Sequence, residues 1–296
     1  MTARIFVSRD AGAVAVGADD VARALTQAAA KKGVPIEIVR TGSRGLYWLE
    51  PMIEVATPNG RVAFGPVTEA DAASVLDAML ADGPHALRLG VAEEIPWLKR
   101  QTRLTFVRCG VVDPRSVEDY KAHGGYKGLA RALTLGTAGI LDEVTKSGLR
   151  GRGGAGFPTG IKWKTVADAG ADQKYVVCNA DEGDSGTFAD RMIMEGDPFV
   201  LIEGMTIAAI CVGATKGYVY IRSEYPHAVE AMNAAIVAAK RAGRACWVRR
   251  SPARPMPSTW RSGSAPAPMS AARKPPCSTA LKASAAWCAP SRRCPR

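Results

Sequence analysis

The sequence predicts an α/β fold followed by a C-terminal tail of different character. Short apolar runs that suit strands alternate with helical segments in residues 1–85 and again in 125–243, a pattern that favours sheets covered by helices. The 296 residues are 47% hydrophobic, which is enough for a sizeable core and, at this length, for two domains. Residues 244–296 lose this periodicity and hold nine of the 19 prolines, so we expect low order there.

Residues 1–85 contain the signals of a small α/β domain. A helix opens at the acids Asp19 and Asp20 and stops at Lys-Lys-Gly, and a second helix opens at Thr68. The strand-like runs are residues 5–7, 35–39, 52–56 and 61–67. The last two runs flank an Asn-Gly turn, which predicts a β-hairpin.

Residues 86–124 have few periodic cues and are predicted to be a connection. A second α/β domain is expected over 125–243, with a glycine-rich loop after its first helix. Its predicted helices are 129–146, 189–195, 198–213 and 226–242, and its strands are 174–178 and 217–222. This alternation favours a largely parallel sheet.

The net charge of +11 belongs entirely to the tail. The chain has 39 Lys and Arg and 28 Asp and Glu; residues 244–296 hold 11 of the basic residues and no acid, which leaves 28 basic and 28 acidic residues before them (39 less 11). The net charge therefore says nothing about the partners of the folded body. We expect none of the partners to be nucleic acid.

We expect a cytoplasmic protein without a membrane span. The most apolar run, 199–212, is interrupted by Glu203 and is shorter than the roughly 20 residues that cross a bilayer. The N-terminus lacks the long apolar stretch of a secretory signal. The body holds three cysteines without paired spacing, Cys109, Cys178 and Cys211, which suits a reducing compartment.

The loop 148–160 has six glycines among thirteen residues, with Arg150 and Arg152 inside it and Lys162 just after it. Backbone N–H groups of glycines, which no side chain covers, and nearby basic side chains can bind phosphate oxygens. The loop contains G-x-G-x-x-G, yet a helix precedes it where the dinucleotide fingerprint needs a strand. A flexible hinge is the alternative. The aromatic rings of Phe157 and Trp163 could stack on a flat heterocycle or pack in the core.

A polar loop, 180–186, follows the strand predicted at 174–178. Ligands of open α/β sheets bind at the carboxyl ends of strands. Asn179 and Asp181 could there supply an amide and a carboxylate to ring-edge or ribose groups, and Glu182 could place a charge beside a redox ring. The alternative is an acidic loop that caps the next helix.

Several separated motifs resemble, in order and spacing, the family of flavin-binding, 51 kDa-like subunits of NADH dehydrogenases. The motifs are 148–163, 178–182, 190–191, 203–205 and 217–222. The family includes the FMN subunit of respiratory complex I, the diaphorase subunit of NAD-reducing hydrogenases and the beta subunit of NAD-dependent molybdenum formate dehydrogenases. The resemblance implies a Rossmann-like FMN-binding domain over roughly 125–243.

The resemblance also implies FMN and NAD(H) as cofactors and a set of residues that hold them. Those expected to contact the flavin nucleotide are Gly151, Arg152, Gly153, Gly154, Lys162, Asn179 and Asp181. Phe157 is expected to stack on the nicotinamide nucleotide, and Glu182 is expected to lie near both. Because the cofactor performs the hydride chemistry, no side chain is expected to act as an acid or base.

Residues 1–85 resemble a thioredoxin-like 2Fe-2S ferredoxin in which the cysteine ligands are replaced. The replacements are Ser8, Ala13, Ser43 and Tyr47. Iron–sulfur clusters need thiolate or comparable ligands, so no metal is expected here. A cluster-free unit ahead of the flavin domain is similar to the formate dehydrogenase beta subunit. That similarity implies a catalytic alpha subunit with molybdenum and iron–sulfur centres and a small 2Fe-2S gamma subunit as partners; the hydrogenase and complex I subunits are the alternatives.

Family members continue beyond this point with a second FMN segment and a domain that binds a 4Fe-4S cluster, and neither is visible in 244–296. We hypothesise that this tail is a frame-shifted continuation, since synonymous codons for 265–277 shifted by one base can read Gly-Ala-Tyr-Val-Cys-Gly-Glu-Glu, which looks like that segment. An intact frame in the DNA around the Arg244 codon would exclude this. The alternative is a basic arm that binds nucleic acid through Trp247, Trp260 and Trp287.

Overall fold

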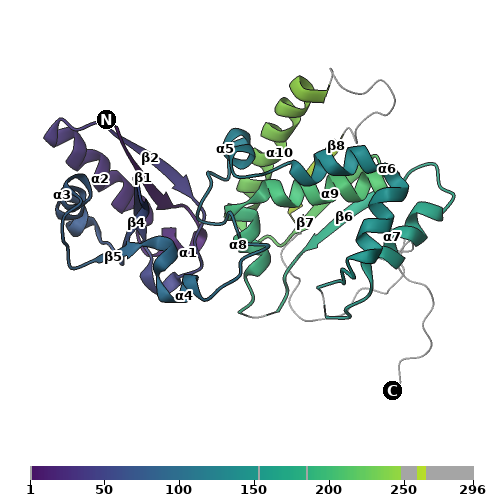
Figure 1. The fold of residues 1–296 in the computed structure, drawn as a ribbon, viewed down its shortest axis with the longest axis horizontal. Coiled ribbons are helices and arrows are strands. Elements are labelled where there is room, and N and C mark those ends of the chain that lie inside the picture. Colours follow the sequence, from purple (N-terminus) through teal and green to yellow (C-terminus); the bar gives the residue numbers. More distant parts are fainter. Residues whose placement is uncertain (1, 153, 185, 248–258, 265–296) are drawn as a thin grey trace. The chain divides into compact units, whose positions relative to one another are not determined.

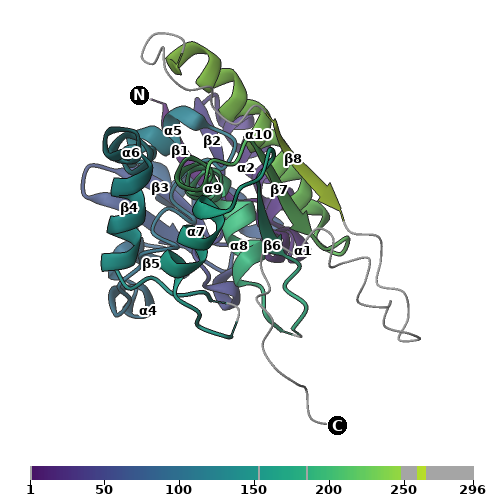
Figure 2. The same cartoon turned by 90° about the vertical axis from the view of Figure 1, so that its right-hand side faces the viewer.

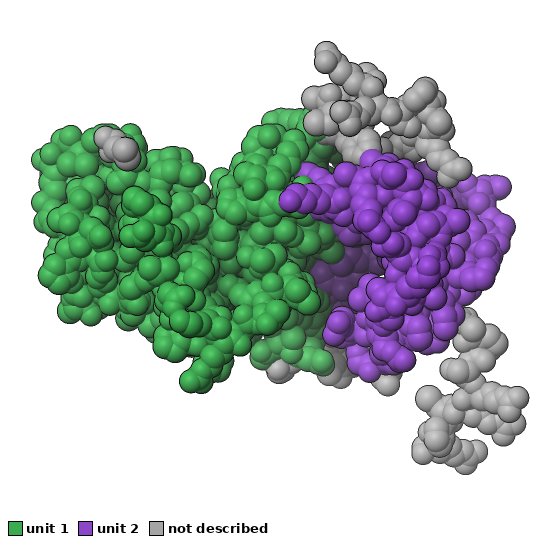
Figure 3. All heavy atoms as spheres, in the orientation of Figure 1, with its two compact units in different colours: residues 1–125, 182–202, 225–251 green, residues 126–181, 203–224, 252–296 purple. Residues whose placement is uncertain are grey.

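The computed structural model describes residues 2–152, 154–184, 186–247 and 259–264. These residues form two compact units, each built from several stretches of the chain (Figure 3). The first unit comprises residues 1–125, 182–202 and 225–251, and the second comprises 126–181, 203–224 and 252–296. The predicted domain 125–243 is thus shared between them, because 182–202 and 225–251 pack with the first unit.

A five-stranded sheet of order β2-β1-β3-β4-β5 forms the centre of the first unit (Figure 1). Its strands are β1 (Ala3–Ser8), β2 (Ile36–Thr41), β3 (Ile53–Thr57), β4 (Gly60–Phe64) and β5 (Arg88–Val91). β1 and β2 are parallel, whereas β1 with β3, β3 with β4 and β4 with β5 are antiparallel. The predicted hairpin at Asn59-Gly60 is confirmed, since Thr57 pairs with Gly60 across the turn.

Two helices, α2 and α3, pack against each other and against this sheet. The helices of residues 1–125 are α1 (Ala11–Ala15), α2 (Ala18–Lys32), α3 (Ala72–Ala81), α4 (Pro96–Lys99) and α5 (Val117–Ala122), with short 3-10 turns η1 (Tyr47–Leu49), η2 (Glu69–Asp71) and η3 (Ala92–Glu94). α2 ends where predicted, at Gly33 in the left-handed conformation (φ 66°). A β-α-β unit followed by a hairpin and a helix is the thioredoxin-like arrangement that the sequence predicts.

The segment predicted as a connection, 86–124, contributes to this unit. β5 pairs with β4, and α4 and α5 follow it. A four-residue strand is too short for alternation of polar and apolar residues to be recognised, which explains why this strand was not predictable from the sequence.

The second unit has a parallel sheet of order β6-β7-β8, as the alternation of elements predicts (Figure 2). Its strands are β6 (Tyr175–Ala180), β7 (Lys216–Ile221) and β8 (Thr259–Ser264). α6 (Lys127–Lys146) and α7 (Thr159–Asp168) belong to this unit, as does α9 (Pro198–Val212) from residue 203 onward. Apolar side chains of α6, α7, α9 and β6 form its core.

The one acidic residue in the apolar run of α9, Glu203, has a structural role. Its side chain is 7% exposed, and its carboxylate accepts hydrogen bonds from the backbone N–H groups of Tyr126 (2.7 Å) and Leu129 (2.8 Å). The carboxylate therefore satisfies N–H groups at the start of α6 that have no partner within the helix.

α8 (Ala189–Gly196) and α10 (Pro226–Trp247) complete the first unit and pack on each other. α10 continues four residues past the predicted domain limit at 243. Within the segment predicted to have low order, the structure thus describes the end of α10 and the strand β8. Residues 248–258 and 265–296 lie outside the described residues, as does most of the stretch that the reading-frame hypothesis concerns. None of the helices described is both long and apolar enough to cross a membrane.

Candidate cofactor site

The glycine-rich loop between α6 and α7 is folded back on itself. Gly151 N donates to Phe157 O (2.9 Å), Arg150 Nη1 donates to Gly156 O (3.1 Å), and Arg150 forms an antiparallel bridge with Pro158. These contacts define a turn of specific shape, which a free hinge would lack. The sequence could not distinguish the role of Arg150, which holds the loop, from that of Arg152, whose side chain is exposed.

Open space surrounds the backbone at the tip of this loop. Gly154 (φ 91°) and Gly156 (φ 59°) adopt the left-handed conformation, and a Cβ added to either would meet no atom within 4 Å. Glycine is the residue that adopts this backbone conformation at least cost. A ligand can therefore approach the main chain directly at both residues. Gly153, predicted to be a flavin contact, lies outside the described residues.

A lysine at the start of α7 lies beside the loop. A Cβ on Gly151 would be 3.7 Å from Lys162 Nζ, and that ammonium lies 5.6 Å from the centroid of the Phe157 ring. α7 begins at Thr159, so the N-terminal end of its dipole lies close to this ammonium. Bare amides, a fixed cation and a helix N-terminus together suit the phosphate of a nucleotide, and these residues fit FMN.

The two aromatic residues near the loop have different surroundings. The side chain of Phe157 is 44% exposed, so one ring face can receive a flat ligand. Trp163 is partly buried and packs against the core of the second unit with neighbours that include Ile140 and Val166. Core packing is thus the role of Trp163, whereas the proposed role of Phe157 stays a prediction.

Asn179 and Asp181 lie at the carboxyl end of β6. Asn179 is exposed and faces Tyr220 in the parallel register with β7, and its Oδ1 accepts a hydrogen bond from Asp181 N (3.1 Å). Both residues therefore lie at the edge where open α/β sheets bind ligands.

Glu182 has a structural role at the next helix. It adopts a left-handed backbone (φ 48°), and its carboxylate accepts hydrogen bonds from the N–H groups of Asp190 (2.9 Å) and Arg191 (3.1 Å) at the start of α8. Burial, and then the charge of Glu182, raise the pKa of Asp190. The capping alternative thus accounts for Glu182, which belongs to the first unit, and its placement near a flavin stays a prediction.

The positions that correspond to cluster ligands in the thioredoxin-like domain are engaged within the protein. The Ser43 hydroxyl donates to Glu50 Oε1 (2.7 Å) and accepts from Gly45 N (2.9 Å), while the Tyr47 hydroxyl lies 3.4 Å from Asp10 Oδ2. Ser8 and Ala13 are buried. Among the described residues, no group of three or more His, Cys, Asp or Glu side chains could hold a metal ion.

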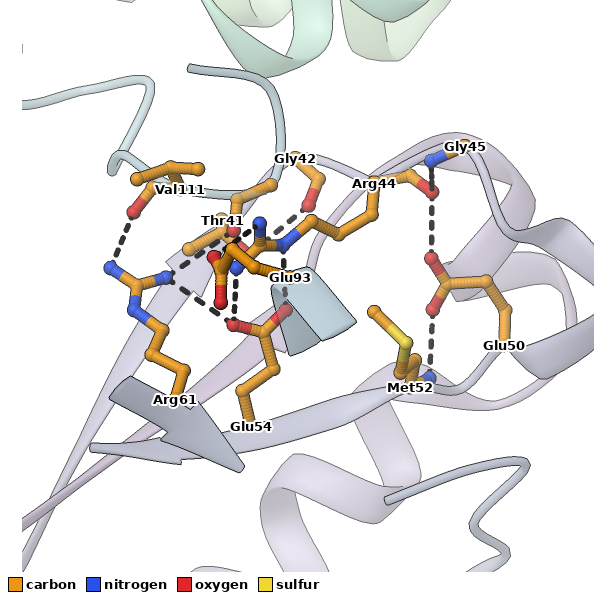
Figure 4. Close-up of polar contacts among 12 residues, drawn as sticks. Thr41, Gly42, Arg44, Gly45, Glu50, Met52, Glu54, Arg61, Glu93 and Val111 are labelled. Atoms are coloured by element: carbon orange, nitrogen blue, oxygen red, sulfur yellow. Dashed lines mark hydrogen bonds and ion pairs between the residues drawn. The ribbon is translucent and has the colours of Figure 1, made fainter. Parts of the chain in front are cut away.

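An ionic network forms around the buried side chain of Arg44 (Figure 4). Arg44 donates through Nε and Nη2 to the two carboxylate oxygens of Glu54, each at 2.8 Å, and through Nη1 to Glu93 (3.0 Å). Arg61 Nη1 lies 3.6 Å from Glu54. Burial alone would lower the pKa of Arg44, but the carboxylates of Glu54 and Glu93 raise it.

Comparison with known proteins matches this part of the chain to flavoprotein subunits. Residues 144–267 match the Nuo51 FMN-binding domain. The NADP-reducing hydrogenase subunit HndC of Solidesulfovibrio fructosivorans is 53% identical over 145 residues, which are 49% of this chain and 29% of that protein. An NADH-quinone oxidoreductase subunit of Aquifex aeolicus is 46% identical over 151 residues, which are 50% of this chain and 35% of that protein.

The matched region is similar to the FMN-binding domain of the 51 kDa-like family, as the sequence motifs predict. The chain spans about a third of the length of these relatives. A crystal structure of an NAD+-reducing [NiFe]-hydrogenase in the air-oxidized state aligns with 82% of this chain and 41% of that chain, at 25% identity and a TM-score of 0.39, which is too low to support an argument.

Proposed function

We propose that this chain is an FMN-binding subunit that exchanges hydride with NAD(H). The observation that carries the proposal is the closed glycine loop, with open backbone at Gly154 and Gly156 and the ammonium of Lys162 beside it, in a region that matches an FMN-binding domain. FMN would supply hydride acceptance and one-electron transfer. A cytoplasmic location is part of the proposal.

The residues of the site would bind and orient the cofactors. The amides of the loop, with Arg152 and Lys162, would hold the flavin phosphate, and Gly151 leaves Lys162 uncovered. The exposed ring of Phe157 would stack on the nicotinamide nucleotide. Asn179 and Asp181 would hydrogen-bond to ribose or ring-edge groups. None of these roles requires a side chain to donate or accept a proton in the reaction.

The second part of the proposal concerns the multi-subunit enzyme to which this chain belongs. We propose an NAD-dependent formate dehydrogenase, in which a molybdenum- and iron–sulfur-containing alpha subunit and a small 2Fe-2S gamma subunit would be partners. Support comes from the thioredoxin-like domain, where Ser8, Ala13, Ser43 and Tyr47 replace cluster ligands. A hydrogenase diaphorase and a complex I subunit are the alternatives, as the names of the relatives suggest.

Titration with flavins tests the site. Flavin fluorescence would be measured with the full chain and with Lys162→Gln, which we expect to weaken FMN binding by about tenfold through loss of a charge-assisted contact. Lys164→Gln is the matched control, because Lys164 is exposed and pairs with Asp168 (2.7 Å) on the same helix. Riboflavin, which lacks the phosphate, should bind with equal affinity to the unsubstituted chain, Lys162→Gln and Lys164→Gln. Equal FMN affinity in all three would contradict the proposed phosphate contact.

Affinity purification of the complex tests the assembly. The chain would be tagged and isolated from its own cells, and the metals of its partners measured. Molybdenum in the complex supports a formate dehydrogenase. Nickel without molybdenum, or co-purification with a membrane quinone reductase, would contradict that part and leave the flavin site unaffected.

A further inference from the structure

A cavity of about 260 Å³ in the first unit collects basic side chains from separate segments of the chain. Arg9 follows β1, Arg40 lies in β2 and Arg115 precedes α5, and all three line the cavity, together with His227 near the start of α10. The cavity belongs to the first unit, whereas the glycine loop belongs to the second.

Two of these arginines are paired with acids that also line the cavity. Arg40 Nη2 lies 2.6 Å from Asp19 Oδ1 and donates to Ser8 O (3.0 Å). Arg115 forms an ion pair with Glu230. The charge and the hydrogen-bonding groups of these two guanidinium groups are therefore largely engaged within the protein.

Arg9 is different. Its side chain makes no hydrogen bond or ion pair with any of the described residues, although its main-chain N–H bonds to Thr41 O (2.7 Å). Burial, and then the charges of Arg115 and Arg40, lower the pKa of Arg9. A guanidinium group in such a place gains from an anion, since it offers a fork of donors matched to carboxylate and phosphate oxygens.

A buried carboxyl group in the same cavity, Glu195, contacts groups other than Arg9. It is 2% exposed; its Oε2 accepts a hydrogen bond from Ala11 N (2.6 Å), and its Oε1 lies 3.9 Å from Arg191 Nε. Burial, and then the charge of Asp10, raise the pKa of Glu195 to about 7. The raised pKa favours the neutral form of this carboxyl group.

We propose that this cavity binds a small oxyanion, a carboxylate or a phosphate group, through the guanidinium of Arg9, with Arg115 and His227 at its border. The volume is below the usual range for drug-sized ligands, about 300 to 1,000 Å³, so the ligand is a small molecule or one end of a larger one. The site lies in the first unit and is lined in part by α8 and α10, and the glycine loop contributes no residue to it.

Chemical labelling with residue resolution tests this site. Phenylglyoxal reacts with accessible guanidinium groups, and peptide mass spectrometry reports each arginine separately. The full chain would be labelled at equal ionic strength in chloride, acetate and inorganic phosphate. Arg4, in the strand β1 that precedes Arg9, is an internal control, because its half-exposed side chain pairs with Glu37 on the surface.

We expect acetate or phosphate to slow the labelling of Arg9, by about threefold at twice the dissociation constant because only unoccupied sites react. Arg4 should label equally in all three salts. Slower labelling of Arg9 in acetate would show that the site accepts a carboxylate. Slower labelling in phosphate but not in acetate would show that it requires a phosphate group. Equal labelling of Arg9 in every salt, or no labelling in chloride, would overturn the proposal. Phosphate bound at the glycine loop would be recognised separately at Arg152.

A pair of variants gives a second measurement. Acetate or phosphate should raise the melting temperature of the wild-type chain and of Arg4→Gln. In Arg9→Gln the acetate shift should disappear, and the phosphate shift should fall to the part that comes from the glycine loop. An unchanged shift in Arg9→Gln would contradict the site. If Arg9→Gln does not fold, the labelling of the wild-type chain still decides.

Discussion

Two loops of similar composition are used in opposite ways. Residues 42–45 read Gly-Ser-Arg-Gly and residues 150–153 read Arg-Gly-Arg-Gly. In the first loop, Arg44 is 6% exposed and bonded to Glu54, and Gly42 lies directly against the backbone of Gly196. In the second loop, Arg152 is exposed and open space adjoins Gly154.

The difference lies in where the polar groups find their partners. The partners of Arg44 and Ser43 are carboxylates of the same domain, so that loop contributes to stability. The glycine loop leaves Arg152 exposed and open space beside Gly154 and Gly156, so an anion can approach its backbone. Substitutions should therefore affect stability strongly in the first loop and weakly in the second.

The largest effect is expected from Glu54→Gln. It leaves the buried guanidinium of Arg44 without its bidentate partner, which should lower the free energy of unfolding by about 3 kcal/mol or more. Urea unfolding followed by circular dichroism measures this. The control is Glu37→Gln, which removes an ion pair between half-exposed side chains and should cost less than about 1 kcal/mol. Equal losses in the two variants would contradict the role of the network.

Gly42→Ala should have the next largest effect. A Cβ there would lie 2.4 Å from the Cα of Gly196, so two backbone segments must separate. We expect a loss of about 2 to 3 kcal/mol in the free energy of unfolding. Thermal and urea unfolding of this variant measure it. A fully stable Gly42→Ala protein would show that the two segments are not in contact.

Stability should also fall as the pH rises from 5 to 8. Burial raises the pKa of Glu50 from its ordinary value of 4.5 to about 7, and the pKa of Glu195 rises similarly. The folded state then binds these protons more tightly than the unfolded state, so the stabilisation is present below about pH 4.5 and is lost as the pH passes 7. We expect a fall on the order of 2 kcal/mol in the free energy of unfolding.

Urea unfolding at the two pH values measures this fall. Glu50→Gln should reduce it, and Glu50→Gln combined with Glu195→Gln should reduce it further. An unchanged pH dependence in the double variant would assign the effect to other groups.

The smallest effect is expected from Gly154→Ala. No atom lies near the added methyl group, so the cost comes only from the left-handed backbone (φ 91°), about 1 kcal/mol. Urea unfolding of Gly154→Ala beside Gly42→Ala compares the two loops at matched substitutions. A larger loss at Gly154 than at Gly42 would reverse the distinction drawn between them.

Much of the fold follows from short-range signals. The helix stop at Gly33, the hairpin at Asn59-Gly60 and the alternation that yields the parallel pair β6 and β7 all depend on neighbours in the chain. The motifs of 148–163, 178–182, 190–191, 203–205 and 217–222 together also predicted the similarity to flavin-binding subunits. Less was predictable about β5, which is only four residues long, and about the assignment of 182–202 and 225–251 to the first unit.

The sequence alone determined which elements form and which residues belong to the glycine loop, because periodicity, turn residues and motifs are local. Only the tertiary structure decided the use of individual side chains. It showed that Glu182 caps α8, that Trp163 packs in the core, and that Arg9 shares a cavity with residues from four other segments. Whether a polar group is satisfied within the protein or open to a ligand depends on partners far away in the chain. Arg44, for example, donates to Glu93, which lies 49 residues further along the chain.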